Sequence, residues 1–117
     1  MTDAPHPDPM TWLTQWYARQ CDGYWEHSYG VSIDTLDNPG WLIKIDLTDT
    51  HLANKAFEEV AFNMDASDGD PSSRWHHCKV GDEQFVAACG VYDLLTVIGI
   101  FRAFTDAFPT DAVFTPR

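Results

Sequence analysis

The stretch from Cys21 to Leu47 constrains the fold more than any other, because it contains two alternating runs of residues joined by a turn. Large side chains recur at every second position from Tyr29 to Thr35, and again from Trp41 to Leu47. This period of two indicates β-strands that each bury one face. The segment Asp37-Asn38-Pro39-Gly40 between them has the proline and glycine of a turn. The sequence therefore predicts a β-hairpin.

The loop of this hairpin must contain an odd number of residues, because a one-residue slip would turn charged side chains toward the core. A five-residue loop over Leu36–Gly40 sets Ile33 opposite Ile43. A three-residue loop gives the same pairing, but it requires a helical conformation of Asn38, which the following proline disfavours. We therefore expect a five-residue loop.

Two helices are expected outside the hairpin. Asp8-Pro9 suits the N-cap and first turn of a helix over residues 9–21, which carries one apolar stripe. Apolar residues at helical spacing predict a second helix over residues 93–108, and Pro109 ends it. The two helices have room to cover the same face of a sheet.

Further strands are expected between the hairpin and the second helix. Residues 75–80 and 84–89 read as two strands around a Gly81-Asp82 turn. Residues 55–65 fit either a strand or a helix, and we favour a strand. Short connections between strands imply antiparallel pairing. The expected fold class is therefore α+β, with an antiparallel meander sheet of about five strands flanked by an N-terminal and a C-terminal helix.

The length of 117 residues suits one domain, and an apolar content of 44% is enough for a hydrophobic core. We place this single domain at residues 9–109, between a disordered tail at residues 1–8 and a second tail at residues 110–117. No apolar run approaches the roughly 20 residues of a membrane span. The first nine residues, MTDAPHPDP, are unlike a signal peptide, so we expect a cytoplasmic protein.

The charge balance bears on the class of partner. The chain has 18 acidic and 7 basic residues, which gives a net charge of −11. Nucleic acids and anionic membranes are disfavoured as partners, because phosphate binding needs lysine and arginine. A basic protein partner suits this charge, although acidity that only keeps the protein soluble fits equally well. The oligomeric state stays open.

Two pairs of residues suggest a rival class, a small thiol- or metal-dependent enzyme. Cys21 and His27 offer a nucleophile and a base, but Cys21 falls on the apolar stripe of the first helix, where thiols are usually inert. His76 and Cys78 share one face of a strand but supply only two metal ligands. The chain lacks the common phosphate-binding and nucleophile-elbow motifs. We therefore expect no catalytic residue, no metal and no cofactor.

A set of motifs resembles the immunity protein 53 family of bacterial polymorphic toxin systems. The matching residues are Trp12-Leu13, Trp16-Tyr17, Cys21-Asp22-Gly23, Trp25-Glu26-His27, Tyr29-Gly30 and Thr35 to Trp41, with Trp75, Cys78 and the helix over residues 94–104. The resemblance implies a small cytosolic protein that binds and blocks a cognate toxin domain without catalytic residues. Residues 65–73 look like an insertion relative to the family pattern. The acidity would suit a toxin with a basic site, such as a nuclease.

Candidate toxin-binding residues follow from the outward face of the hairpin and the segments beside it. They are Asp22, Tyr24, Trp25 and Glu26 in the connector, Ser32, Asp34, Lys44 and Asp46 on the strands, and Asp37 and Asn38 in the turn. Aromatic side chains beside acids suit a binding hot spot for a basic partner. Trp25 also suits a buried position, Glu26 and His27 also suit a role in holding the connector to the first helix, and turn formation explains Asp37 and Asn38 better than binding does. The acidic loop at residues 65–70 is the alternative location.

Overall fold

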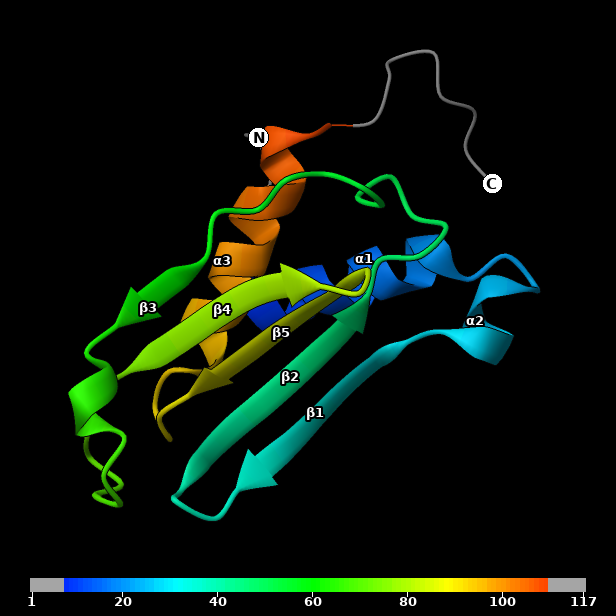
Figure 1. Cartoon of the computed structure of the whole chain (residues 1–117). Helices are drawn as coiled ribbons and strands as arrows, with labels where there is room; N and C mark the ends of the chain where they lie inside the picture. The colour runs from blue at the N-terminus through cyan, green and yellow to red at the C-terminus, as the bar shows by residue number, and fades with distance from the viewer. Residues whose placement is uncertain (1–7, 110–117) are drawn as a thin grey trace, which may run out of the picture.

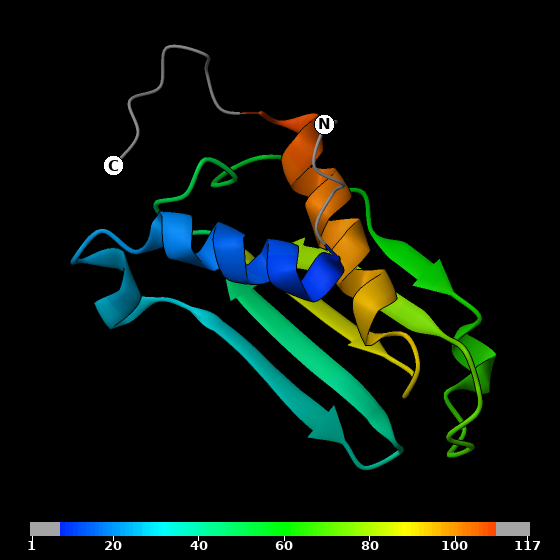
Figure 2. The ribbon, with the colours of Figure 1, turned by 180° about the vertical axis from the view of Figure 1, so that it is seen from behind.

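The computed structural model describes residues 8–109 as a five-stranded antiparallel sheet with two long helices on one of its faces (Figures 1 and 2). In chain order the elements are α1 (Pro9–Gln20), α2 (Trp25–Ser28), β1 (Val31–Leu36), β2 (Gly40–Asp46), β3 (Val60–Phe62), the 3-10 helix η1 (Met64–Ala66), β4 (His76–Gly81), β5 (Gln84–Cys89) and α3 (Leu94–Ala107). This arrangement confirms the α+β class and both flanking helices. Apart from Asp8, the two predicted tails lie outside the described residues.

The strand order in the sheet is β1-β2-β5-β4-β3, so the sheet is not a simple meander (Figure 1). After β2 the chain passes through residues 47–59 to the far edge, forms β3 there, and returns through β4 and β5 to pair β5 with β2. Leu52 in this crossing segment is fully buried, which fixes the segment to the core. The strand favoured for residues 55–65 is confirmed only over Val60–Phe62.

The hairpin has the predicted register, with Ile33 opposite Ile43, but its loop is shorter than predicted. Leu36 pairs with Gly40, which leaves the three residues 37–39 in the loop, and the expectation of five is wrong. That expectation rested on the bias of a residue before proline against helical conformations, which the pairing of Leu36 with Gly40 overrides; the Asn38–Pro39 peptide bond in this loop is cis. Gly40 is needed for close approach, because a Cβ there would lie 2.2 Å from the carbonyl oxygen of Cys89.

The turn between β4 and β5 also differs from the prediction by one position. Gly81 pairs with Gln84, so the turn consists of Asp82 and Glu83, which both have positive φ angles (53° and 56°). Two consecutive positive φ angles match the twist of a two-residue hairpin, and aspartate tolerates them better than most residues. The unpredicted helix α2 lies in the connector that leads into β1.

Helix α1 begins as predicted. The Asp8 side chain caps the helix by accepting a hydrogen bond of 2.8 Å from the Thr11 N–H, and Pro9 occupies the first turn. Helix α3 begins differently, because the buried Asp93 side chain does not cap it. This carboxylate instead accepts hydrogen bonds from the Arg74 side chain at 2.6 Å and from the Trp75 N–H at 3.0 Å. Asp93 therefore fixes the start of α3 to the segment before β4.

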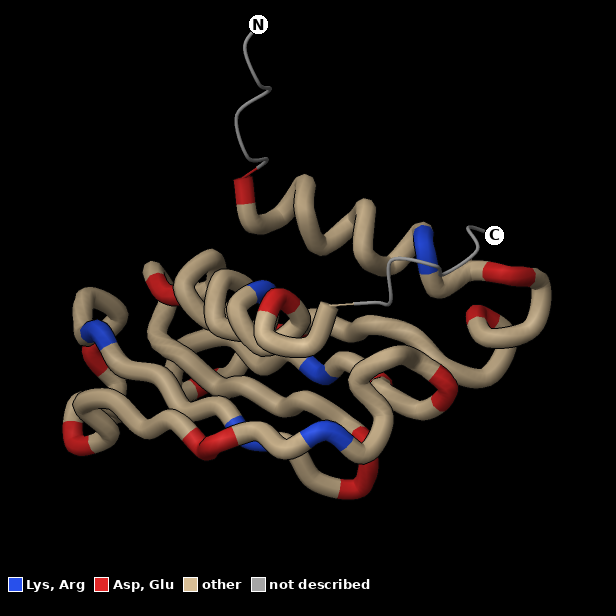
Figure 3. Tube along the Cα trace, turned by 90° about the horizontal axis from the view of Figure 1, so that it is seen from above, with Lys and Arg blue, Asp and Glu red and all other residues tan. Residues whose placement is uncertain are grey.

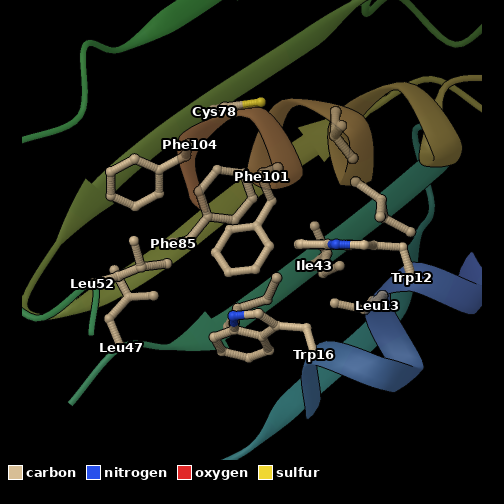
Figure 4. Packing of buried hydrophobic residues seen from close by; sticks show 14 of the residues in the cluster. Trp12, Leu13, Trp16, Ile43, Leu47, Leu52, Cys78, Phe85, Phe101 and Phe104 are labelled. Carbon is tan, nitrogen blue, oxygen red and sulfur yellow. The ribbon is translucent and has the colours of Figure 1, made fainter. Parts of the chain in front are cut away.

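Phe101 on α3 lies at the centre of the hydrophobic core (Figure 4). Its ring centroid is 5.0 Å from that of Trp16, 5.8 Å from that of Trp12 and 5.0 Å from that of Phe85. The two tryptophans belong to α1 and Phe85 belongs to β5, so one side chain joins both helices to the sheet. Edge-to-face and tilted aromatic pairs of this kind add to the free energy gained from burial alone.

We expect Phe101→Ala to lower the free energy of unfolding by about 3–5 kcal/mol, because it leaves a cavity where both helices meet the sheet. Leu95→Ala is the matched control, since Leu95 lies on the same helix but its residue is 49% exposed. The control should change stability by no more than about 0.5 kcal/mol. Urea denaturation followed by circular dichroism measures both values. Equal losses in the two variants would contradict the central role of Phe101.

Candidate functional site

Helices α1 and α3 lie on the same side of the sheet, so no helix within residues 8–109 covers the opposite face, which we call the open face (Figures 1 and 2). The buried Ile43 and Ile45 of β2 point toward the helices. Because side chains alternate along a strand, Lys44 and Asp46 point to the open face, together with Ser32 and Asp34 of β1. Four predicted contact residues therefore share one surface, and Ser32 lies directly opposite Lys44.

Asp46 also holds the backbone at the start of the hairpin. Its Oδ2 accepts a hydrogen bond of 2.9 Å from the Gly30 N–H, and its Oδ1 accepts one of 2.9 Å from the Gln84 side-chain amide. These residues line a shallow hollow of about 240 Å³ together with Val31, Ser32 and Lys44. Small-molecule sites usually enclose roughly 300–1,000 Å³. The hollow is thus better suited to contact with a protein than to a small substrate.

The connector before β1 is held by two carboxylates that bond to the backbone. Asp22 Oδ1 accepts hydrogen bonds from the N–H groups of Tyr24 (2.9 Å) and Trp25 (3.0 Å). Glu26 accepts from the N–H groups of Asp22 (3.0 Å) and Gly23 (2.9 Å). Hydrogen bonding to its own N–H, and then to those of Asp22 and Gly23, lowers the pKa of the Glu26 carboxyl against an opposing effect of desolvation.

The two aromatic candidates in the connector lie in opposite environments. Trp25 is only 5% exposed, donates a hydrogen bond of 2.8 Å from Nε1 to the Thr48 carbonyl, and packs edge-on against Trp16. It is part of the core and offers no side chain to a partner. Tyr24 is 82% exposed, so it is the aromatic side chain that a partner can reach.

The candidate turn residues lie at the other end of β1. Asp37 is exposed and Asn38 is half-buried. The acidic loop at residues 65–73 lies beside them, because a Cβ on Gly69 would sit 3.5 Å from the Asn38 carbonyl oxygen. Both segments belong to the same end of the sheet (Figure 1). The view along the sheet in Figure 3 shows acidic positions spread over the molecule, with few basic ones between them.

One surface was missed by the sequence reasoning. Four large hydrophobic side chains are exposed near the acidic loop and the start of α3, namely Phe62, Met64, Tyr92 and Leu95. Two contacts connect their segments: the Asn63 side chain donates to the Arg74 carbonyl at 2.8 Å, and Arg74 binds Asp93. We call these four residues the apolar end patch. Leu95 lies outside the apolar stripe of α3. This position is the one signal in the sequence that could have revealed its exposure.

The cysteines and histidines named for the rival thiol or metal chemistry differ in burial and in contacts. Cys78 and Cys89 are buried, and burial raises the pKa of each thiol to about 12, so both stay protonated near neutral pH. Cys21 donates a hydrogen bond of 3.4 Å from its thiol to the Tyr17 carbonyl. His76 stacks on Phe62 at 5.2 Å. Within residues 8–109, no group of three histidine, cysteine or acidic side chains is placed to hold a metal ion.

Comparison with known proteins identifies one family. A family model described as immunity protein 53 matches residues 10–106 of the 117 in the chain. Neither the curated proteins nor the solved structures contain a match. The matched range runs from the start of α1 almost to the end of α3 and includes every candidate contact residue. No helix in the described part of the chain has the length and apolar character needed to cross a membrane.

The connector provides a test of pH dependence. Because the folded-state pKa of Glu26 is lowered, its charged form stabilises the fold above the ordinary pKa of 4.5, and this contribution is lost as the pH falls through the lower folded-state value. We expect Glu26→Gln to be less stable than the wild type at pH 7, with a difference that narrows at about pH 3. Urea denaturation at both pH values measures this.

Glu58→Gln is the matched control for this experiment, because Glu58 is an exposed glutamate outside the connector. It should leave the free energy of unfolding unchanged within about 0.5 kcal/mol at pH 7. A Glu26→Gln variant as stable as the wild type at pH 7 would show that the carboxylate does not hold the connector.

Proposed function

The chain belongs to the immunity protein 53 family, and on this premise we propose that it binds and neutralises a cognate toxin domain of a polymorphic toxin system. The family match over nearly the whole described domain carries the proposal. Neutralisation in this form requires tight association and no chemistry by the immunity protein. We also propose that it acts in the cytoplasm of the bacterium that makes the toxin, where it meets toxin before any damage occurs.

The open face and its borders support this function as a binding surface. Ser32, Asp34 and Lys44 are exposed there, Tyr24 stands at one end of β1, and Asp37 stands at the other. A partly polar surface with an exposed tyrosine has the composition of a protein interface. We propose that these residues contact the toxin. Asp22, Glu26 and Asp46 act mainly by holding the backbone that presents them.

The acidity supports a basic toxin domain, such as a nuclease. With a net charge of −11, the protein attracts a basic partner over distances comparable to the Debye length, about 8–10 Å at physiological salt. Such attraction acts mainly on the rate of association. A basic site that binds phosphates would be a natural complement to this charge.

The arrangement of thiols and histidines favours a binding protein over the rival enzyme. Cys78 is buried with a raised pKa, so it lacks the thiolate character that a nucleophile needs. The Cys21 thiol donates a hydrogen bond to the Tyr17 carbonyl of α1, and His27 is exposed on α2. We propose that the protein acts without catalysis.

Co-expression tests the function directly. We expect bacteria that express the toxin domain encoded beside this gene to survive when this chain is present, and the two proteins to co-purify as a stable complex. An unrelated acidic protein of similar size is the control for charge alone. Continued killing without complex formation would contradict the immunity function. Rescue without complex formation would instead indicate chemistry on the toxin or its target.

Association kinetics test the proposed surface. We expect Asp34→Asn combined with Asp37→Asn to slow toxin association roughly twofold to tenfold at low salt, and to weaken its salt dependence. The control combines Asp106→Asn on α3 with Glu58→Gln, which removes the same charge from exposed positions elsewhere. Stopped-flow measurements at two salt concentrations separate the variants. Equal slowing in both would show that net charge, and not the open face, guides association.

A further inference from the structure

We infer that the toxin docks at the outer edge of β1. An extended, basic segment of the toxin chain pairs with β1 there, antiparallel or parallel to it, and so adds a strand to the sheet. This inference rests on the proposed function and specifies how the complex forms. Strand addition uses the hydrogen-bonding groups of the backbone for affinity, and the side chains on either side of the strand for specificity.

The pairing of β1 shows which backbone groups are available. β1 is at the edge of the sheet and pairs only with β2 among the described strands. The Asp46 N–H donates to the Gly30 carbonyl at 3.0 Å, which sets the phase of the antiparallel ladder. Bonded pairs alternate with non-bonded pairs in such a ladder. The N–H and C=O groups of Val31, Ile33 and Thr35 therefore point away from β2 and toward the open edge.

The two edges of the sheet differ in a way that favours β1. The opposite edge strand, β3, has three residues, whereas β1 has six in unbroken register with β2. Proteins commonly protect edge strands with proline, lysine, a bulge or a short length. Val31–Leu36 contains no proline or lysine, its register shows no bulge, and Asp34 is its single charged residue. β1 is thus the longer and less protected edge.

The residues proposed as contacts surround this edge. Ser32 and Asp34 project from β1 itself, on the open face. The connector with exposed Tyr24 leads into β1, and the loop with exposed Asp37 follows it. A segment paired along β1 would lie beside all of them, so a single docking mode accounts for candidates at both ends of the strand.

Charge identifies the occupant as a basic segment of a partner and not a second copy of this chain. Asp34 and Asp37 lie on or beside β1, with Asp22 and Glu26 in the connector, and Lys44 is the lysine on the neighbouring strand. Basic side chains opposite these acids would be attracted to them. Two copies of this chain would each bring a charge of −11, which opposes edge-to-edge pairing.

The test uses a pair of substitutions at one position. Thr35 is exposed, and its N–H points to the open edge. Thr35→Pro removes that donor without breaking a bond to β2, and edge strands tolerate proline at such positions. Thr35→Ala keeps the donor and removes only the side chain. We expect the proline variant to bind the catalytically inactivated toxin domain encoded beside this gene at least about tenfold more weakly than the alanine variant.

Amide hydrogen exchange gives a second readout that needs no substitution. In the free protein the amides of Val31, Ile33 and Thr35 should exchange faster than those of Ser32 and Asp34, which bond to β2. Binding of the toxin should slow the exchange of the amides of Val31, Ile33 and Thr35. Circular dichroism of the two Thr35 variants checks that both remain folded. If the proline variant is misfolded, hydrogen exchange of the free and toxin-bound wild type tests the inference instead.

Two results would overturn the inference, and they have different consequences for the proposed function. If the wild type binds the toxin while these three amides stay unprotected, docking occurs elsewhere and the immunity function stands; protection near Tyr92 and Leu95 would place it at the apolar end patch. If the wild type does not bind or neutralise the toxin, the function and the edge inference both fail.

Discussion

Burial of a single sheet face under two aromatic-rich helices is the constraint on which the rest of the structure depends. Phe101 meets Trp16 of α1 and Phe85 of β5 at ring distances of 5.0 Å, so the packing of both helices is coupled through one side chain. Because this aromatic cluster uses one face of the sheet, polar side chains such as Asp34 and Lys44 lie on the other face, which no helix within residues 8–109 covers. The arrangement of the core therefore determines which residues can meet a partner.

Local sequence patterns predicted the elements better than their order. Alternation fixed the hairpin register, because a slip would have placed charges in the core, and Ile33 does lie opposite Ile43. No local pattern specifies that β3 crosses to the far edge, since this depends on how residues 47–59 pack through the buried Leu52. The hairpin loop was predicted too long because the conformational bias of Asn38 before proline was given more weight than the pairing of Leu36 with Gly40, which closes a shorter loop.

The candidate site was predictable as a set of exposed polar positions, but their individual roles were not. A carboxylate that binds a partner and one that accepts hydrogen bonds from nearby N–H groups look alike in a sequence. In the structure Glu26 and Asp46 both accept hydrogen bonds from the backbone of the segment around β1, a role that their places in the sequence do not distinguish from partner binding. Trp25 belongs to the core and Tyr24 to the surface, although the two are adjacent, since α2 turns one inward.

An open edge strand that serves a partner must still avoid its own copies. Hydrogen-bonding groups along an edge do not distinguish one extended chain from another, so selectivity has to come from side chains and charge. In the docking mode that we propose, the acids around β1 would repel a second copy of this chain and attract a basic segment. Asp34 lies on the edge strand itself, where a like charge on a neighbouring strand would be most destabilising. The same negative charge that opposes pairing between two copies of this edge strand would thus favour a basic partner.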